Sequence, residues 1–153
     1  MPGEALRRLI GTWRLVAVEA RDARGVVTHP YGAHPVGYLT YTPEGRMAVS
    51  IMRAPAPRVE STDLFRGAAE ALAGGHAYVG YSGTVSVEDA QEGDAVQGTV
   101  VHTLDTCSYP NWVGTEQRRR FLLEGDELTL TTPRIERGGT GASATVRWVR
   151  YRG

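Results

Sequence analysis

The sequence predicts an all-β domain of about eight short antiparallel strands, with one helix inserted mid-chain. Three observations lead to this prediction. Short runs rich in β-branched and aromatic residues alternate with turns rich in glycine, proline and aspartate along most of the 153 residues. Helical periodicity occurs in one stretch, near residue 65. No strand–helix–strand rhythm is present, so a parallel sheet is disfavoured. This pattern alone is compatible with a sandwich or an up-and-down barrel.

The first three predicted strands lie before the helix. Residues 11–20 are rich in β-formers and end at a turn over residues 21–25. Residues 36–42 and 46–52 flank a short loop that contains Gly45, which is typical of a β-hairpin. The prolines at 55 and 57 end this hairpin, because proline cannot donate a hydrogen bond to a neighbouring strand.

A helix is predicted to start near residue 63 and to stop at Gly74-Gly75. Ser61 or Thr62 is expected to cap its N-terminus, with Asp63 in the first turn. Its apolar residues recur with helical spacing and therefore share one face: Leu64, Phe65, Ala68, Ala69, Leu72 and Ala73.

The strand pattern resumes after the helix. The predicted strands are residues 81–87, 96–104, 115–123, 127–132 and 142–151. The turns between them are expected at the acidic stretch 88–94, at Glu124-Gly125-Asp126 and at the glycine-rich loop 138–141. No internal repeat or linker interrupts the chain, so residues 1–153 are predicted to form a single domain.

Several motifs in this order resemble those of the bacterial and fungal lipocalin-like domain family. They are Gly11-Thr12-Trp13-Arg14-Leu15-Val16 with its G-x-W pattern, Val36-Gly37-Tyr38-Leu39-Thr40-Tyr41-Thr42, Pro110-Asn111-Trp112-Val113-Gly114-Thr115-Glu116-Gln117, Arg119-Arg120-Phe121 and Gly125-Asp126-Glu127-Leu128-Thr129-Leu130-Thr131. The resemblance implies a closed, eight-stranded up-and-down barrel with a ligand cavity. The mid-chain helix differs from fatty-acid-binding proteins, whose helix pair follows the first strand.

Composition disfavours several classes of protein. The 17 basic and 17 acidic residues give zero formal net charge, which does not suit a nucleic-acid-binding protein. Cys107 is the only cysteine, so neither an internal disulfide nor a multi-cysteine metal site is expected. The N-terminus lacks the apolar run of a signal peptide, and no stretch is long enough to span a membrane. We therefore expect a cytoplasmic monomer or homodimer with neither a nucleic-acid nor a membrane partner.

Side chains alternate between the two faces of a strand, so one apolar anchor assigns the inner face of each strand. The predicted inner set is Leu39, Tyr41, Met47, Val49, Ile51, Tyr81, Gly83, Val85, Val87, Val100, His102, Leu104, Gln117, Arg119, Phe121 and Leu123. The first strand is ambiguous, because Trp13, Leu15 and Ala17 alternate with Val16 and Val18. A mostly apolar interior with a few polar groups is the usual form of a small-molecule site.

The candidate site residues follow from this assignment. His102, Tyr41 and Tyr81 are candidate catalytic residues, and the candidate ligand-binding residues are Arg119, Gln117, Trp112, Phe121, Leu39 and Met47. Each polar member also has a structural interpretation. Arg119 is then paired with Glu19 or a backbone carbonyl, and His102 is a core histidine with satisfied hydrogen bonds. Trp13 is expected to pack at the closed end, under Arg147 or Arg150.

No metal, nucleotide or flavin signature is present, so no cofactor is expected. Two functions remain for a barrel that binds a small molecule. By analogy with related small barrels, the first is a cofactor-free cyclase, isomerase or hydratase acting on a polyketide-like specialised metabolite. His102 or a tyrosine then moves a proton, and Arg119 stabilises the developing oxyanion. The alternative is a carrier for a small, partly apolar anionic metabolite. A purely structural barrel, filled by side chains, is the third possibility.

Overall fold

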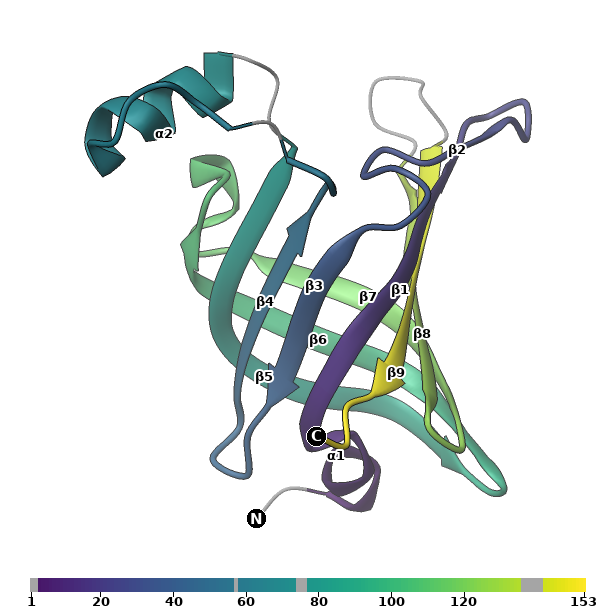
Figure 1. Cartoon of the computed structure of the whole chain (residues 1–153). Helices are drawn as coiled ribbons and strands as arrows, with labels where there is room; N and C mark the ends of the chain where they lie inside the picture. The colour runs from purple at the N-terminus through teal and green to yellow at the C-terminus, as the bar shows by residue number, and fades with distance from the viewer. Residues whose placement is uncertain (1–2, 57, 74–76, 136–141) are drawn as a thin grey trace.

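The computed structural model describes residues 3–56, 58–73, 77–135 and 142–153. It is a β-barrel with a helix at each end (Figure 1). The strands are β1 (Gly11–Arg21), β2 (Val27–Thr28), β3 (Val36–Tyr41), β4 (Arg46–Met52), β5 (Tyr78–Glu92), β6 (Ala95–Cys107), β7 (Glu116–Glu124), β8 (Glu127–Ile135) and β9 (Ala142–Arg150). The helices are α1 (Glu4–Leu9), α2 (Leu64–Ala73) and the one-turn 3-10 helix η1 (Pro110–Trp112).

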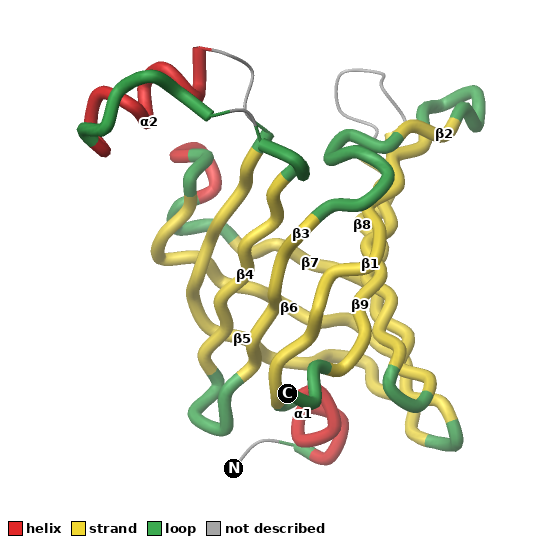
Figure 2. The backbone as a smooth tube through the Cα atoms, viewed as in Figure 1, coloured by secondary structure: helices red, strands yellow, loops and turns green. Residues whose placement is uncertain are grey.

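The strands form one antiparallel sheet that closes on itself. Their order is β2-β1-β3-β4-β5-β6-β7-β8-β9, and β1 also pairs with β9. Apart from the two-residue β2, each strand therefore lies beside its neighbours in sequence, as Figure 2 shows. The predicted eight-stranded up-and-down barrel is confirmed, and the sandwich is excluded. Closure removes the exposed edges that would otherwise invite pairing with other chains.

A β-bulge resolves the ambiguity of the first strand. The pairing of β1 with β9 shifts between Leu15 and Ala17, so Val16 is an extra residue in the strand. Trp13 and Leu15 are therefore buried before the bulge and Val18 after it, while Val16 is exposed. Both alternating sets contribute to the core, which strict alternation does not allow.

The acidic stretch predicted as a turn over residues 88–94 is mostly strand. β5 continues to Glu92, and only Gly93 and Asp94 separate it from β6. A bulge follows Glu88, where Asp89 has a φ of 54°. The side chains beyond this point are exposed on both faces, so no apolar alternation marks the extension in the sequence. The other predicted strands match the observed ones within a few residues; the loop 138–141 lies outside the described residues.

One end of the barrel is closed by α1, a short helix that the sequence analysis did not predict. Ala5, Leu6 and Leu9 of this helix are buried in the core. The Trp13 indole N–H donates to the Leu9 carbonyl at 2.9 Å. The Arg150 guanidinium lies 4.2 Å from the Trp13 ring centroid, which confirms the expected cation–π pair with Arg150. The first described residues and the C-terminus lie at this end (Figure 1).

At the opposite end lies α2, which confirms the predicted mid-chain helix. Its cap is Asp63, whose carboxylate accepts a hydrogen bond from the Phe65 N–H at 3.1 Å. The capping prediction of Ser61 or Thr62 was therefore wrong, since the helix begins one residue after Asp63. The Leu64 and Phe65 side chains are 75% and 86% exposed. The predicted stop at Gly74-Gly75 lies outside the described residues.

Candidate functional site

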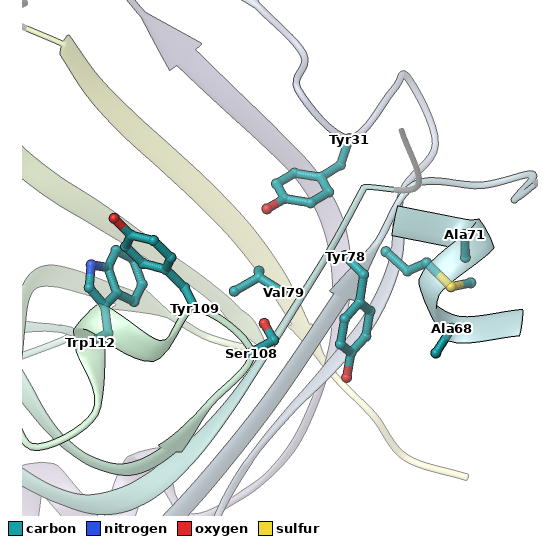
Figure 3. A pocket seen from close by; sticks show the side chains of 9 residues that line it. Tyr31, Ala68, Ala71, Tyr78, Val79, Ser108, Tyr109 and Trp112 are labelled. Carbon is teal, nitrogen blue, oxygen red and sulfur yellow. The ribbon is translucent and has the colours of Figure 1, made fainter. Parts of the chain in front are cut away.

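The open end of the barrel contains a pocket of about 840 Å³, which we call the mouth pocket. Side chains from α2, from the strand ends and from the η1 loop face it from opposite sides (Figure 3). It is lined by Tyr31, Met52, Ala68, Ala71, Tyr78, Val79, Ser108, Tyr109 and Trp112. Four aromatic rings and few polar atoms give it the character of a small-molecule site, and its volume accommodates a compact organic molecule.

Deeper in the barrel lies a second cavity of about 30 Å³, which we call the inner chamber. It is lined by Leu39, Val49, Ile51, Tyr81, His102, Arg119, Leu130, Val146 and Trp148. The two cavities follow each other along the strands. On β5, Val79 lines the mouth pocket, and Tyr81, two residues further along and therefore on the same face, lines the inner chamber.

Three side chains form a layer between the two cavities. The Trp112 ring lies edge-on to the Tyr81 ring, with 6.1 Å between their centroids. The Arg119 guanidinium lies 5.8 Å from the Trp112 ring centroid. Trp112 lines the mouth pocket, whereas Tyr81 and Arg119 line the inner chamber. A ligand in the mouth pocket therefore contacts this layer first.

Tyr41 and His102 form a buried polar pair beside the chamber. The Tyr41 hydroxyl and the His102 Nε2 are 2.8 Å apart, and both side chains are about 1% exposed. Burial, aided by the Arg119 charge, lowers the pKa of His102 to about 3. Burial also raises the pKa of Tyr41 well above its ordinary value. Both groups are therefore neutral at physiological pH.

Two buried ring nitrogens at the chamber have no hydrogen-bond partner among the described residues: His102 Nδ1 and Trp148 Nε1. Arg119 is partly satisfied, since it donates to the Arg118 carbonyl at 2.9 Å and to Gln117 Oε1 at 3.4 Å. Burial lowers the pKa of Arg119. Among the described residues it forms no ion pair, and the Glu19 considered as its partner instead contacts Arg147 at 3.2 Å.

Most of the predicted site residues converge on this region. Leu39, Tyr81, His102 and Arg119 line the inner chamber. Tyr41 and Gln117 support it through their hydrogen bonds to His102 and Arg119. Trp112 lines the mouth pocket. By contrast, Met47 and Phe121 are fully buried in the core and line neither cavity.

Sequence reasoning missed several residues that line the two cavities. Trp148 was not singled out, although its place on the last strand gave a signal, because alternation from Val146 puts both on one face. Tyr31, Tyr78 and Tyr109 come from a loop, a strand end and a segment before η1, where no periodicity assigns a direction. Their arrangement at the mouth is a property of the closed barrel.

Comparison with known proteins identifies the family. The family model described as "Lipocalin-like domain" matches residues 10–151. The chain belongs to this family. Among curated proteins, this lipocalin-like chain is similar to the 4'-hydroxy-3'-methoxypropiophenone carrier protein ppsC of Aspergillus oryzae, with 36% identity over 87 residues. The match covers 56% of this chain and 78% of that protein. No solved structure matches the chain. None of the helices in the described part of the chain is long and apolar enough to cross a membrane.

Proposed function

We propose that this lipocalin-like protein is a carrier that binds a small, partly apolar aromatic metabolite at the open end of its barrel. The observation that carries the proposal is the mouth pocket, whose 840 Å³ are bounded mainly by aromatic and aliphatic side chains. Aromatic rings such as Tyr109 and Trp112 favour a flat aromatic ligand, because ring stacking adds to the burial of apolar surface. Strands β4 and β5 supply Met52, Tyr78 and Val79, and the rest of the lining comes from loops, η1 and α2.

The curated relative supports a carrier more than an enzyme. Its name describes the carriage of a hydroxylated and methoxylated propiophenone, which is a small aromatic ketone. Such a molecule matches the size and the aromatic lining of the mouth pocket in this chain. We therefore extend the carrier role, and the class of aromatic ketones, to this protein as part of the proposal.

A cofactor-free cyclase or isomerase acting on a specialised metabolite is the second candidate, favoured by the buried Tyr41–His102 contact. A general base works best when its pKa is near the working pH. The pKa of His102 is about 3, so this imidazole is a weak base at neutral pH. The high pKa of Tyr41 likewise makes its hydroxyl a poor proton donor. The lowered pKa of His102 and the raised pKa of Tyr41 therefore favour the carrier over the enzyme.

The test is a calorimetric titration with 4'-hydroxy-3'-methoxypropiophenone, followed by mass spectrometry of the recovered ligand. We expect one molecule to bind per barrel and to be released unchanged. Ala71→Trp places an indole in the mouth pocket and should weaken binding at least tenfold. Phe65→Ser, on an exposed part of the same helix, is the matched control and should bind as the wild type does.

Two results would count against this proposal. Absence of binding to this ligand and to a panel of related aromatic ketones would remove the carrier role. Conversion of the ligand to a product, lost in His102→Gln while binding remains, would replace the carrier with the enzyme.

A further inference from the structure

Two buried ring nitrogens of residues that line the inner chamber, His102 Nδ1 and Trp148 Nε1, lack a hydrogen-bond partner among the described residues. The polar lining of the chamber consists of Tyr81, His102, Arg119 and Trp148. Trp148 Nε1 is always a donor, and the Arg119 guanidinium carries only donors. Among the described residues no carboxylate lines the chamber. A buried donor without an acceptor costs free energy, so such groups usually have a purpose.

The hydrogen bond to Tyr41 fixes which nitrogen of His102 carries the proton. If the Tyr41 hydroxyl donates to Nε2, the neutral imidazole has its proton on Nδ1, and one buried donor lacks a partner. If Nε2 donates instead, both the tyrosine proton and the Nδ1 lone pair lack partners. The first arrangement leaves fewer unsatisfied groups and is favoured. His102 thus adds a second N–H donor beside Trp148.

We propose that the inner chamber is a subsite that selects ligands by a carbonyl oxygen, with Trp148 as its specificity-determining residue and His102 as the second donor. This proposal rests on the carrier function and specifies which ligands the carrier takes. The aromatic body of the ligand lies in the mouth pocket, and its carbonyl group points into the barrel. The N–H groups of Trp148 and His102 then gain the acceptor that they lack among the described residues.

The size of the chamber favours one neutral oxygen. A volume of 30 Å³ accommodates a single water-sized group, because about 10–15 Å³ is enough for one water molecule. A carboxylate would bring two oxygens and a charge into this space. Of the described residues that line the chamber, Arg119 alone is cationic, and two of its N–H groups are already engaged. A ketone or aldehyde has no such desolvation cost.

The layer between the cavities allows this pose. Trp112, Tyr81 and Arg119 meet through ring and cation–π contacts, and no hydrogen bond among the described residues holds the Trp112 indole. Trp112 belongs to the short helix η1 at the rim, where it is only partly buried. A flat ligand therefore reaches the chamber by displacing ring contacts alone.

The experiment compares propiophenone with propylbenzene, which differ only in the replacement of the carbonyl group by a methylene. In the wild type we expect the ketone to bind at least tenfold more tightly, as measured by calorimetry. Trp148→Phe removes the donor and keeps an aromatic ring, so the preference should fall to within threefold while propylbenzene affinity stays unchanged. Trp13→Phe is the matched control, since this equally buried indole already donates to Leu9, and it should retain the tenfold preference.

A second measurement uses the wild-type protein alone and therefore does not depend on whether a variant folds or binds. The chain has three tryptophans, and their indole N–H groups give separate NMR signals. We expect propiophenone, but not propylbenzene, to move the Trp148 indole proton downfield, and the bound ketone to show a lowered carbonyl stretching frequency.

The outcomes separate the two proposals. Equal affinity for both probes, with an unmoved Trp148 signal, would overturn the carbonyl subsite and leave the carrier function standing. Binding of neither probe, nor of the aromatic ketones used above, would overturn the carrier function and the subsite with it. Tighter binding of 3-phenylpropionate than of propiophenone would show that the chamber selects an anion through Arg119, contrary to this inference.

Discussion

Two buried tryptophans at different depths in the barrel show how its parts differ. Trp13 and Trp148 are 0% and 2% exposed, and they come from the neighbouring strands β1 and β9. The Trp13 indole N–H is bonded to the backbone of α1 at the closed end. The Trp148 indole N–H has no partner in the described part of the chain, and the Trp148 side chain lines the inner chamber. This difference is consistent with the proposal above, in which the chamber binds a ligand group while the closed end stabilises the fold.

Two arginines repeat this contrast. Arg150 donates to the carbonyls of Arg8 and Ile10 at 2.8 and 3.1 Å and contacts Asp126 at 3.4 Å. It therefore ties α1 to the sheet. Arg119 has no carboxylate partner among the described residues and instead lies between Trp112 and the chamber. Buried polar groups that satisfy one another stabilise a fold, whereas those left unsatisfied are available to a ligand.

The largest expected effect concerns His102 and acid. Its folded-state pKa of about 3 lies below the ordinary value of 6.5, so only the unfolded chain takes up this proton between those pH values. The free energy of unfolding therefore falls as the pH drops through this window. At up to about 1.4 kcal/mol per pH unit, the loss reaches about 4 kcal/mol. Chemical denaturation at a series of pH values measures it.

His102→Gln provides the comparison for this measurement. Glutamine does not titrate and retains a group that hydrogen-bonds to Tyr41. Exposed carboxylates such as Asp105 and Asp126, whose pKa values are lowered by hydrogen bonds from Arg46 and Arg152, remain in both proteins. The difference between the two pH profiles therefore isolates His102. If the two stability profiles ran parallel from pH 6.5 to 3, the prediction that His102 stays neutral in the folded protein would be wrong.

The next effect separates the two tryptophans. Trp13→Phe leaves the Leu9 carbonyl without its side-chain donor and should lower the free energy of unfolding by about 1–3 kcal/mol. Trp148→Phe loses the same side-chain volume but removes a donor that has no partner among the described residues, so we expect it to cost about 1 kcal/mol less than Trp13→Phe. Urea denaturation of the ligand-free proteins measures both. If both variants lost the same free energy of unfolding, the hydrogen bond of the Trp13 indole would not distinguish the closed end from the chamber.

A smaller effect separates the two arginines. Arg150→Met breaks the hydrogen bonds to the carbonyls of Arg8 and Ile10 and should cost about 1–2 kcal/mol. Hydrogen exchange should then accelerate within α1 before the rest of the barrel. Arg119→Met removes an incompletely paired charge from a mostly buried position, so it should leave stability unchanged or raise it slightly. If Arg119→Met lowered the free energy of unfolding more than Arg150→Met did, Arg119 and not Arg150 would be the arginine that stabilises the fold.

Apolar alternation predicted most of the barrel interior because each strand has one buried face. It placed Leu39 and His102 correctly beside the cavity, and the G-x-W motif located Trp13 at the closed end. Alternation could not predict the bulge at Val16, since an inserted residue changes the phase without changing the composition. The six residues of α1 are also too few for helical periodicity to be recognised.

The polar character of the chamber was less accessible from sequence. Whether an indole N–H finds a partner depends on which backbone carbonyl the fold brings near, and Trp13 and Trp148 look alike in sequence. The lining of the mouth pocket is equally hard to predict from sequence, because Tyr31, Tyr109 and Ala71 come from elements far apart in the chain. Both features arise only when the barrel closes.

The smallest expected effect concerns α2, at the mouth and far from the satisfied network of α1. Phe65 is 86% exposed, so Phe65→Ser removes little buried surface and should change the free energy of unfolding by less than about 0.5 kcal/mol. Leu9→Ala, in the fully buried part of α1, is the contrasting variant and should cost about 2–5 kcal/mol. Thermal denaturation of both variants, with sedimentation to follow their association state, makes the comparison. A loss above 1 kcal/mol for Phe65→Ser would mean that this ring is covered in solution. The open end of the barrel would then also contribute to stability, and the proposed division between a stabilising closed end and a ligand-binding open end would be wrong.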